Sequence, residues 1–484
     1  MKNNIRKIVG YLLIIPITFV LSCKKLDVPP ISSVTSSNFG QSATQIEAAY
    51  TASMNFLWGR YYGYADVIFY VFQNDDQWQG GNLVIPANNG DLLWQMHYQA
   101  LTNINNALLA IKQGRVQGET PQTIAALTGE GKLLRAHNYF NLVRLFGDVP
   151  LITEDTPDPA NNLMARSSVK DVYTLIVSDL QYAADNLPDS WSNAPGKPTS
   201  GTAKSLLAKA YLTMATYPLN DPNYYQKAAD AANSVINSGT YALTDSCVNV
   251  FKPENKYSRE MIWSYNSTYD DRTSSARSWA PSEWLTGGWD GAPVDTAFEH
   301  HWTAQPRKDA YLLLGLNGQP YTTAFVTATP YVKKFFYYIT ESDFNKNQCA
   351  TNLPIIRYAD VLLIYAEAAN QANGGPTQAA CDAINLVINR ANGYVPNAGH
   401  PLLTTRMSKQ NFDNAVIQER NWELCFEQPD RWFDICRKRI LDKVSAPYPQ
   451  ELANYSPNDY LFPIPQADLK TDKLLTQNPG YPTP

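Results

Sequence analysis

Two stretches of the chain combine aromatic rings with amide and carboxylate side chains. In the first, Trp78 stands among amides, carboxylates and glycines, and the second lies between residues 269 and 290. The candidate contact residues are Asn74, Asp76, Trp78, Tyr269, Trp279, Trp284 and Trp289. An indole buries a large apolar area at small entropic cost, while amides and carboxylates pair with hydroxyl groups. This mixture predicts the binding of a neutral, polar ligand such as an oligosaccharide.

The remaining tryptophans have different surroundings. Trp94 lies in a helical pattern and Trp263 in a strand-like run, so both are predicted to be core residues. For Trp302, a core position is favoured over a ligand platform. The Asp75-Asp76 pair also fits a turn cap. A calcium site there stays open as an alternative, although no EF-hand-like alternation supports it.

No motif indicates catalysis. The chain has no GxSxG, HExxH, P-loop or GxGxxG pattern. The adjacent His300 and His301 would point apart on a strand, which predicts no metal site, and no cofactor is expected. The chain is therefore predicted not to be an enzyme. A glycoside hydrolase remains the enzymatic alternative, because its two carboxylates are brought together only in space.

The N-terminus has the pattern of a secretion signal. A short basic start precedes an apolar run over residues 8–21, which is too short for a comfortable membrane span. Cys23 follows directly behind Leu-Ser, as in a bacterial lipobox. We expect residues 1–22 to be a signal peptide, Cys23 to be lipidated, and residues 23–40 to be a tether. The alternative is an ordinary secretory signal with an incidental cysteine.

Length, charge and cysteine spacing limit the kinds of fold and ligand that this chain can have. The 484 residues suffice for more than one core or for a large helical array. The formal net charge is −5 and the basic residues are dispersed, which excludes a nucleic-acid footprint. Beyond Cys23, the five cysteines are widely spaced without a CxxC pair, so zinc is not expected. A disulfide is possible but not favoured, and Cys425 and Cys436 are predicted to be small buried residues.

Helical periodicity dominates the chain outside its centre. The predicted helices cover about residues 42–58, 91–111, 121–147, 168–188, 200–217, 222–239, 356–372, 377–390 and 408–443, the last broken near Pro429. Several are joined by short turns as hairpins like tetratricopeptide units. Asp91 and Thr120 are predicted caps, and the helix after them is predicted to start at Ser167 or Ser168. A Pro-rich tail beyond residue 455 is expected to run over the surface.

The centre of the chain does not follow a helical pattern. Residues 241–354 are rich in aromatic, Gly, Pro, Ser and Thr residues, with strand-like runs such as 331–339. Five of the eleven tryptophans fall between Trp263 and Trp302. We interpret this segment as a large insertion that binds the ligand. It separates a helical region over residues 41–240, which carries an early loop at 59–90, from another over residues 355–484.

Four motifs resemble those of a known family. They are Arg135-Ala136-His137-Asn138-Tyr139-Phe140 followed by Phe146-Gly147-Asp148-Val149-Pro150-Leu151, then Leu353 to Leu363, then Glu419 to Leu424 with Asp430 to Asp434, and Phe462-Pro463-Ile464-Pro465. In this order they resemble the SusD/RagB family of Bacteroidetes outer-membrane lipoproteins. The resemblance covers nearly the whole mature chain.

This resemblance implies a mostly helical fold of about four tetratricopeptide-like pairs backing an irregular, partly β ligand-binding region. It implies a surface-exposed lipoprotein of the outer membrane that delivers oligosaccharides, or sometimes peptides, to a SusC-like TonB-dependent transporter. In the family, ligand contacts come from the early loop and the central insertion, whereas the four motifs are structural. A lid or scaffold without its own ligand affinity is the alternative.

The third motif places opposite charges three or four residues apart. This spacing occurs among Glu419, Arg420 and Glu423. It occurs again among Asp430, Arg431 and Asp434. The spacing is typical of stabilising pairs along one helix. A solvated helix face is the alternative. The interleaved aromatic residues favour semi-buried ion pairs that lock the terminal helix onto the array.

Overall fold

The computed structural model describes residues 39–58, 90–157, 163–268, 276–427, 429–445, 456 and 458–484. Residues 1–39 and 40–484 are two separate units, and every element below belongs to the second. The predicted signal peptide, Cys23, Asn74, Asp76, Trp78 and Tyr269 lie outside the described residues. Within the described ranges, every helix falls short of the length and apolarity that a bilayer crossing requires.

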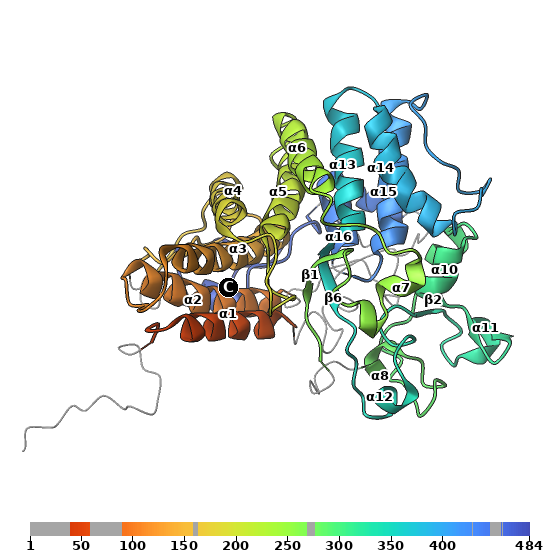
Figure 1. The fold of residues 1–484 in the computed structure, drawn as a ribbon, viewed down its shortest axis with the longest axis horizontal. Coiled ribbons are helices and arrows are strands. Elements are labelled where there is room, and N and C mark those ends of the chain that lie inside the picture. Colours follow the sequence, from red (N-terminus) through yellow and green to blue (C-terminus); the bar gives the residue numbers. More distant parts are fainter. Residues whose placement is uncertain are drawn as a thin grey trace, which may run out of the picture. The chain divides into compact units, whose positions relative to one another are not determined.

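Four helical pairs form a continuous array (Figure 1). The pairs are α1 (Ala43–Trp58) with α2 (Asp91–Lys112), α3 (Pro121–Phe146) with α4 (Val169–Asn186), α5 (Ser200–Met214) with α6 (Asn223–Asn237), and α13 (Tyr358–Ala372) with α14 (Gln378–Ala391). Each helix packs against the next in this order, and α6 packs directly against α13. The structure therefore confirms the predicted tetratricopeptide-like array.

Side-chain caps explain where several helices begin. The Thr120 hydroxyl accepts a hydrogen bond from Thr123 N at the start of α3, and Ser168 starts α4 in the same way. Such caps satisfy backbone N–H groups that lack a partner within the helix. The predicted cap at Thr120 is confirmed, and Ser168 is one of the two predicted starts of α4. The prediction for Asp91 is wrong, because Gly90 is the N-cap of α2 without a side-chain hydrogen bond and Asp91 is the first helical residue.

Between α6 and α13 the chain forms short elements. These are α7 (Cys247–Val250), η3 (Pro253–Asn255), β1 (Met261–Tyr265), α8 (Ala276–Trp279), α9 (Thr296–His301), α10 (Pro306–Tyr311), β2 (Leu312–Leu313), β3 (Gly315–Leu316), β4 (Gln319–Pro320), α11 (Tyr321–Ala324), β5 (Tyr331–Val332), α12 (Glu341–Asn345) and β6 (Leu353–Arg357). The described strands pair as β1–β6, β2–β5 and β3–β4, all antiparallel. Because β1 pairs with β6, the central region leaves the array and returns to it at one place.

Two local predictions for the central region are wrong. The strand expected over residues 331–339 is limited to Tyr331–Val332. His300 and His301 lie on helix α9 instead of a strand. The reason is a cap, since Asp295 Oδ1 accepts hydrogen bonds from Ala297 N and Phe298 N.

The C-terminal part closes the fold. Helix α15 (Lys409–Leu424) packs against α13 and α14, and α16 (Asp430–Lys438) packs against α15. Helices α17 (Leu441–Ser445) and α19 (Gln466–Thr471) follow. The tail does not simply run over the surface as predicted. Phe462 and Ile464 are fully buried, and Phe462 N donates to Leu145 O at 2.7 Å, which ties the tail to the end of α3.

A balanced set of buried charges joins the central region to the array. We call it the central ion cluster, and it comprises Glu260, Arg307, Lys334, Arg357, Arg390, Glu419, Glu423 and Glu427. At its centre Glu423 accepts from Arg307 Nη1 at 2.7 Å, Arg357 Nη1 at 2.7 Å and Arg390 Nη2 at 2.6 Å. Burial raises the pKa of Glu423, but these three guanidinium groups outweigh it and hold that pKa well below its usual range.

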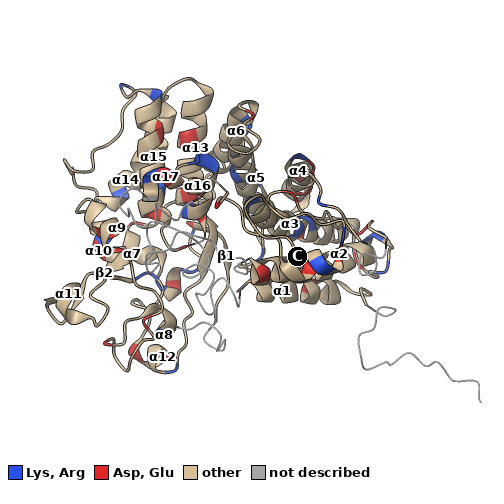
Figure 2. Ribbon diagram, turned by 180° about the vertical axis from the view of Figure 1, so that it is seen from behind, with Lys and Arg blue, Asp and Glu red and all other residues tan. Residues whose placement is uncertain are grey.

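A second set of buried charges lies where α13, α15 and α16 meet (Figure 2). Arg420 donates to Asp360 at 2.6 Å and to Asp434 at 2.8 Å. Arg437 binds Glu367 through both terminal nitrogens. The prediction of ion pairs locking the terminal helices is confirmed. Their expected spacing along one helix is mostly wrong, because Arg420 and Arg437 find carboxylate partners on other elements, although Asp434 and Arg437 on α16 do have the i,i+3 spacing.

Candidate ligand-binding site

The predicted tryptophans that the structure describes lie at the end of α8, which is Trp279, and in the loop that follows it, which holds Trp284 and Trp289. We call residues 277–291 the aromatic loop. Gly288 N donates to Pro281 O at 3.0 Å, and Trp289 N donates to Arg277 O at 2.7 Å. These bonds close the loop on itself, so its backbone is fixed by its own chemistry and not only by packing.

Glycine is required at the point where the loop closes. A Cβ atom on Gly288 would lie 2.1 Å from the carbonyl oxygen of Ala280, which no real contact allows. The preceding Gly287 has a φ of 104°, a conformation that other residues rarely adopt. The two glycines therefore permit the tight closure that carries Trp289 outward.

The tryptophans of the central region differ sharply in exposure. Trp289 is 56% exposed, and Trp284 is half-buried with its ring centroid 5.0 Å from that of Tyr337. The prediction that Trp279 is a platform is wrong. Its side chain is 1% exposed and packs 4.6 Å from the ring of Phe335, because α8 directs it into the core.

The other tryptophans in question are core residues. Trp94 is 5% exposed and Trp263 is 4% exposed, which confirms both predictions. Trp302 is also buried, and its ring stacks on Trp422 with an interplanar angle of 2°. Of the predicted contact residues that the structure describes, Trp284 and Trp289 therefore keep solvent-exposed surface, whereas Trp279 does not.

Polar side chains brace the aromatic loop. Asp290 Oδ1 accepts from Ser282 N and from the Tyr331 hydroxyl, each at 2.7 Å. Burial, together with the Asp290 carboxylate, raises the pKa of Tyr331, so its hydroxyl stays protonated and donates. Across the loop, Thr286 donates to Asn345 Oδ1 at 2.7 Å and ties the loop to α12. One carboxylate oxygen of Asp290 therefore braces the loop.

Sequence reasoning missed the support behind Trp284. Phe336 and Tyr337 form the surface on which its ring rests, at centroid distances of 5.5 and 5.0 Å. Lys333 lies 4.2 Å from the centroid of the Tyr337 ring. The available signal was the aromatic run at residues 335–338, which we interpreted only as a strand.

A hollow of about 360 Å³ lies beside β1 and the end of α1. Three aromatic residues, Tyr257, Trp263 and Tyr265, line it together with the polar Glu130 and Asn266. Helix α1 ends at the residue before the predicted early loop, and β1 leads toward position 269. The described segments that adjoin these two stretches in the sequence, α1 and β1, therefore both contribute to the lining of the hollow.

The described residues contain no group of three or more His, Cys, Asp or Glu side chains that could hold a metal ion. None of the five described cysteines forms a disulfide. Burial raises the pKa of the Cys247 thiol to about 11, which keeps it protonated at neutral pH.

Residues 184–481 match the sequence profile described as the SusD family. The chain belongs to the SusD family. This confirms the resemblance drawn from the four motifs. In addition, residues 65–212 match a SusD-like profile described as starch-binding associating with outer membrane.

Individual SusD-like proteins align along nearly the whole chain. The SusD-like protein P2 of Formosa agariphila is 27% identical over 512 residues, covering 96% of this chain and 97% of that protein. A SusD homolog from Bacteroides thetaiotaomicron has a similar structure, with a TM-score of 0.79, 23% identity, and coverage of 92% and 98%. A laminarin-binding SusD-like protein gives a TM-score of 0.72, with 24% identity and coverage of 91% and 100%. The SusD fold therefore extends over the whole described region.

Proposed function

We propose that this protein binds an oligosaccharide at the cell surface and passes it, unaltered, to a SusC-like TonB-dependent transporter. In this proposal, the helical regions 41–240 and 355–484 form a rigid frame, and residues 241–354 carry the ligand. Acylation of Cys23 would anchor the frame to outer-membrane lipid. Trp289 and Trp284 supply ring contacts, and Asn74, Asp76, Trp78 and Tyr269 complete the site from the other predicted stretches.

The observation that carries this proposal is the exposed indole of Trp289 on a loop closed by its own hydrogen bonds. A sugar ring offers C–H faces that pack on an indole. Because the loop is already ordered, binding costs little further conformational entropy. The description of one matched profile as starch-binding, and of one similar structure as laminarin-binding, supports a glycan as the ligand class.

A direct test measures binding of laminarin and of starch to the purified full chain by isothermal titration calorimetry. Trp289→Ala should weaken the binding of the preferred glycan by about 1–3 kcal/mol, because the ring contact is lost. Leu285→Ala is the matched control, since Leu285 is 50% exposed on the same loop but carries no ring. Equal affinity of Trp289→Ala and the parent would remove Trp289 from the site.

The absence of catalysis is tested in the same samples. The glycan should be depleted from solution without being shortened, so reducing ends should stay constant over time. An increase in reducing ends would favour the glycoside hydrolase alternative. Co-purification with a SusC-like transporter without affinity for any glycan or peptide would favour the lid or scaffold alternative.

The anchor is tested by Cys23→Ser. The parent chain should sediment with outer membranes, since two or more acyl chains hold a protein firmly to lipid. The variant should be recovered in the soluble fraction. Recovery of both proteins with the membrane would show that Cys23 is not the anchor.

A further inference from the structure

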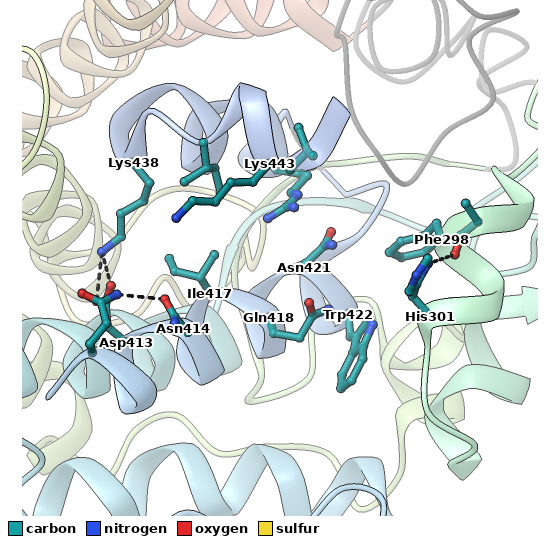
Figure 3. A pocket seen from close by; sticks show the side chains of 15 residues that line it. Phe298, His301, Asp413, Asn414, Ile417, Gln418, Asn421, Trp422, Lys438 and Lys443 are labelled. Atoms are coloured by element: carbon teal, nitrogen blue, oxygen red, sulfur yellow. Dashed lines mark hydrogen bonds and ion pairs between the residues drawn. The ribbon is translucent and has the colours of Figure 1, made fainter. Parts of the chain in front are cut away.

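A second hollow, of about 530 Å³, lies between α9, α15 and the α16–α17 segment (Figure 3). Its volume is within the range of small-molecule sites. It shares no lining residue with the aromatic loop or with the hollow beside β1. Asn414, Gln418 and Lys443 are exposed, so the hollow is open to solvent.

The wall of this hollow combines apolar and amide groups. Phe298 and Trp422 lie on the apolar side, while Gln418 and Asn421 contribute amides from α15 (Figure 3). The Nδ1 atom of His301 donates to Ala297 O at 2.6 Å, which leaves Nε2 to accept a hydrogen bond in the neutral ring. Both rings are nearly buried and Trp422 stacks on Trp302, so the amides and His301 supply the polar contacts that fit a molecule rich in hydroxyl groups.

Asn421 gives an independent sign of a missing ligand group. Its side chain is only 4% exposed, and its Oδ1 atom has no hydrogen-bond partner within the part of the chain that the structure describes. Figure 3 shows the side chain extending from α15 toward the helix that carries Lys443. A buried carbonyl oxygen without a partner is costly, so a hydroxyl donor placed here would be favoured.

The charge at the hollow is positive. Lys438 is balanced, because it contacts Asp413 and Glu367 at 2.9 Å each. Lys443 also lines the hollow and makes no ion pair with any described residue. Its ammonium group is therefore available to an anionic group on a bound molecule.

We propose that this hollow binds an anionic sugar unit, meaning a hydroxyl-rich ring that carries a carboxylate or a sulfate. Asn421 and Gln418 pair with ring hydroxyls, and Lys443 pairs with the anion. This site is separate from the platform of Trp289, and it stands whether or not Trp289 binds a neutral glycan.

The test compares charged and neutral probes on the purified full chain by isothermal titration calorimetry. Trigalacturonate and a galactotriose of the same linkage form the carboxylate pair, and galactotriose carrying 6-sulfate forms the sulfate arm. At least one charged probe should bind roughly tenfold or more tightly than the neutral one, because a charge-assisted hydrogen bond is gained. Higher ionic strength should reduce this preference.

Three variants locate the binding. Lys443→Ala should abolish the preference for the charged probe, and Gln418→Ala and Asn421→Ala should each weaken it several-fold. Lys170→Ala is the matched control, because Lys170 is an exposed lysine on α4 far along the array. Lys443 and Gln418 are exposed, so their variants decide the test even if Asn421→Ala does not fold.

Three results would overturn the proposal. They are equal affinity for charged and neutral probes, no effect of Lys443→Ala, and no measurable binding of either charged probe. Loss of trigalacturonate binding in Trp289→Ala would likewise place the anionic sugar on the aromatic loop instead. Failure of laminarin and starch binding alone would leave this proposal standing and would count only against the proposed function.

Discussion

On the side where the central region meets α15, Arg307 and Lys334 are completely buried among glutamates. On the aromatic loop of the same region, Trp289 is 56% exposed. The usual distribution places charges outside and indoles inside. The central region departs from this distribution twice. Where it contacts α15 it buries charges, and on the aromatic loop it exposes an indole.

This contrast shows how the irregular central region is fixed in one orientation on the helical array. A buried ion cluster tolerates few arrangements, because a displaced side chain would leave an uncompensated charge. Each carboxylate of the central ion cluster therefore constrains the orientation of the segment on the array. The aromatic loop is closed separately, by backbone hydrogen bonds and Gly288, so its exposed ring needs no burial to stay in place.

The largest effect should come from removing the centre of the ion cluster. Glu423→Ala removes the one carboxylate that Arg307, Arg357 and Arg390 all contact and leaves these buried guanidinium groups with fewer partners. We expect a loss of about 3–5 kcal/mol in the free energy of unfolding, measured by urea denaturation. Asp382→Ala, at an exposed position on α14, should change it by less than about 0.5 kcal/mol. A small effect of Glu423→Ala would show that the cluster does not hold the region.

The next largest effect is a pH-dependent contribution of Glu419 to the free energy of unfolding. The pKa of Glu419 is raised by burial but is lowered overall by Arg307 and His400. A carboxylate with a lowered folded-state pKa stabilises the protein above its unfolded-state value of about 4.3, and this contribution is lost as the pH falls below that value. Glu419→Gln should therefore cost about 1–3 kcal/mol at neutral pH. The difference from the parent should shrink in denaturation curves measured at increasingly acidic pH, and a constant difference would contradict the assignment.

A smaller effect should separate the two tryptophans of the aromatic loop. Trp284→Ala removes a half-buried ring that packs on Phe336 and Tyr337, and should lower the free energy of unfolding by about 1–2 kcal/mol. Trp289→Ala should lower it by less than about 0.5 kcal/mol, because its ring is mostly exposed. Thermal denaturation of both variants checks this order. Equal losses would mean that Trp289 also contributes to the core.

The smallest effect should come from the hydrogen bonds that Asp290 accepts within the aromatic loop and from Tyr331. Asp290→Asn keeps an acceptor for Ser282 N and the Tyr331 hydroxyl but removes its charge. We expect a loss of about 0.5–1.5 kcal/mol in the stability of the loop. Hydrogen exchange at the amides of residues 282–290 should report it, with exchange in α13 unchanged. Faster exchange in α13 as well would show that the loop is not an independent unit.

Helices were predictable because their signals are local. The caps at Thr120 and Ser168, and the apolar periodicity behind them, specify α3 and α4 without reference to distant residues. The same reasoning failed at His300 and His301, where the cap Asp295 was overlooked and an aromatic-rich context suggested a strand. It also failed for the tail, since only the packing of Phe462 beneath the end of α3 shows that it is buried.

The binding site was predictable only as a region. Trp279 and Trp289 lie ten residues apart in the same predicted stretch, yet one is buried against Phe335 and the other is exposed. The difference arises from the direction of α8 and from the closure of the loop at Gly288. Neither feature has a periodic pattern that a sequence could display.

By itself the sequence determined the helical array, most of its caps and the family, because these follow from spacings of a few residues and from motifs in a fixed order. Only the tertiary structure decided which indoles face solvent and which charges pair. Arg307 and Glu423 are 116 residues apart, and the partners of a buried charge are chosen by the packing of whole elements. Pairings between residues so far apart have no local sequence pattern from which they could be predicted.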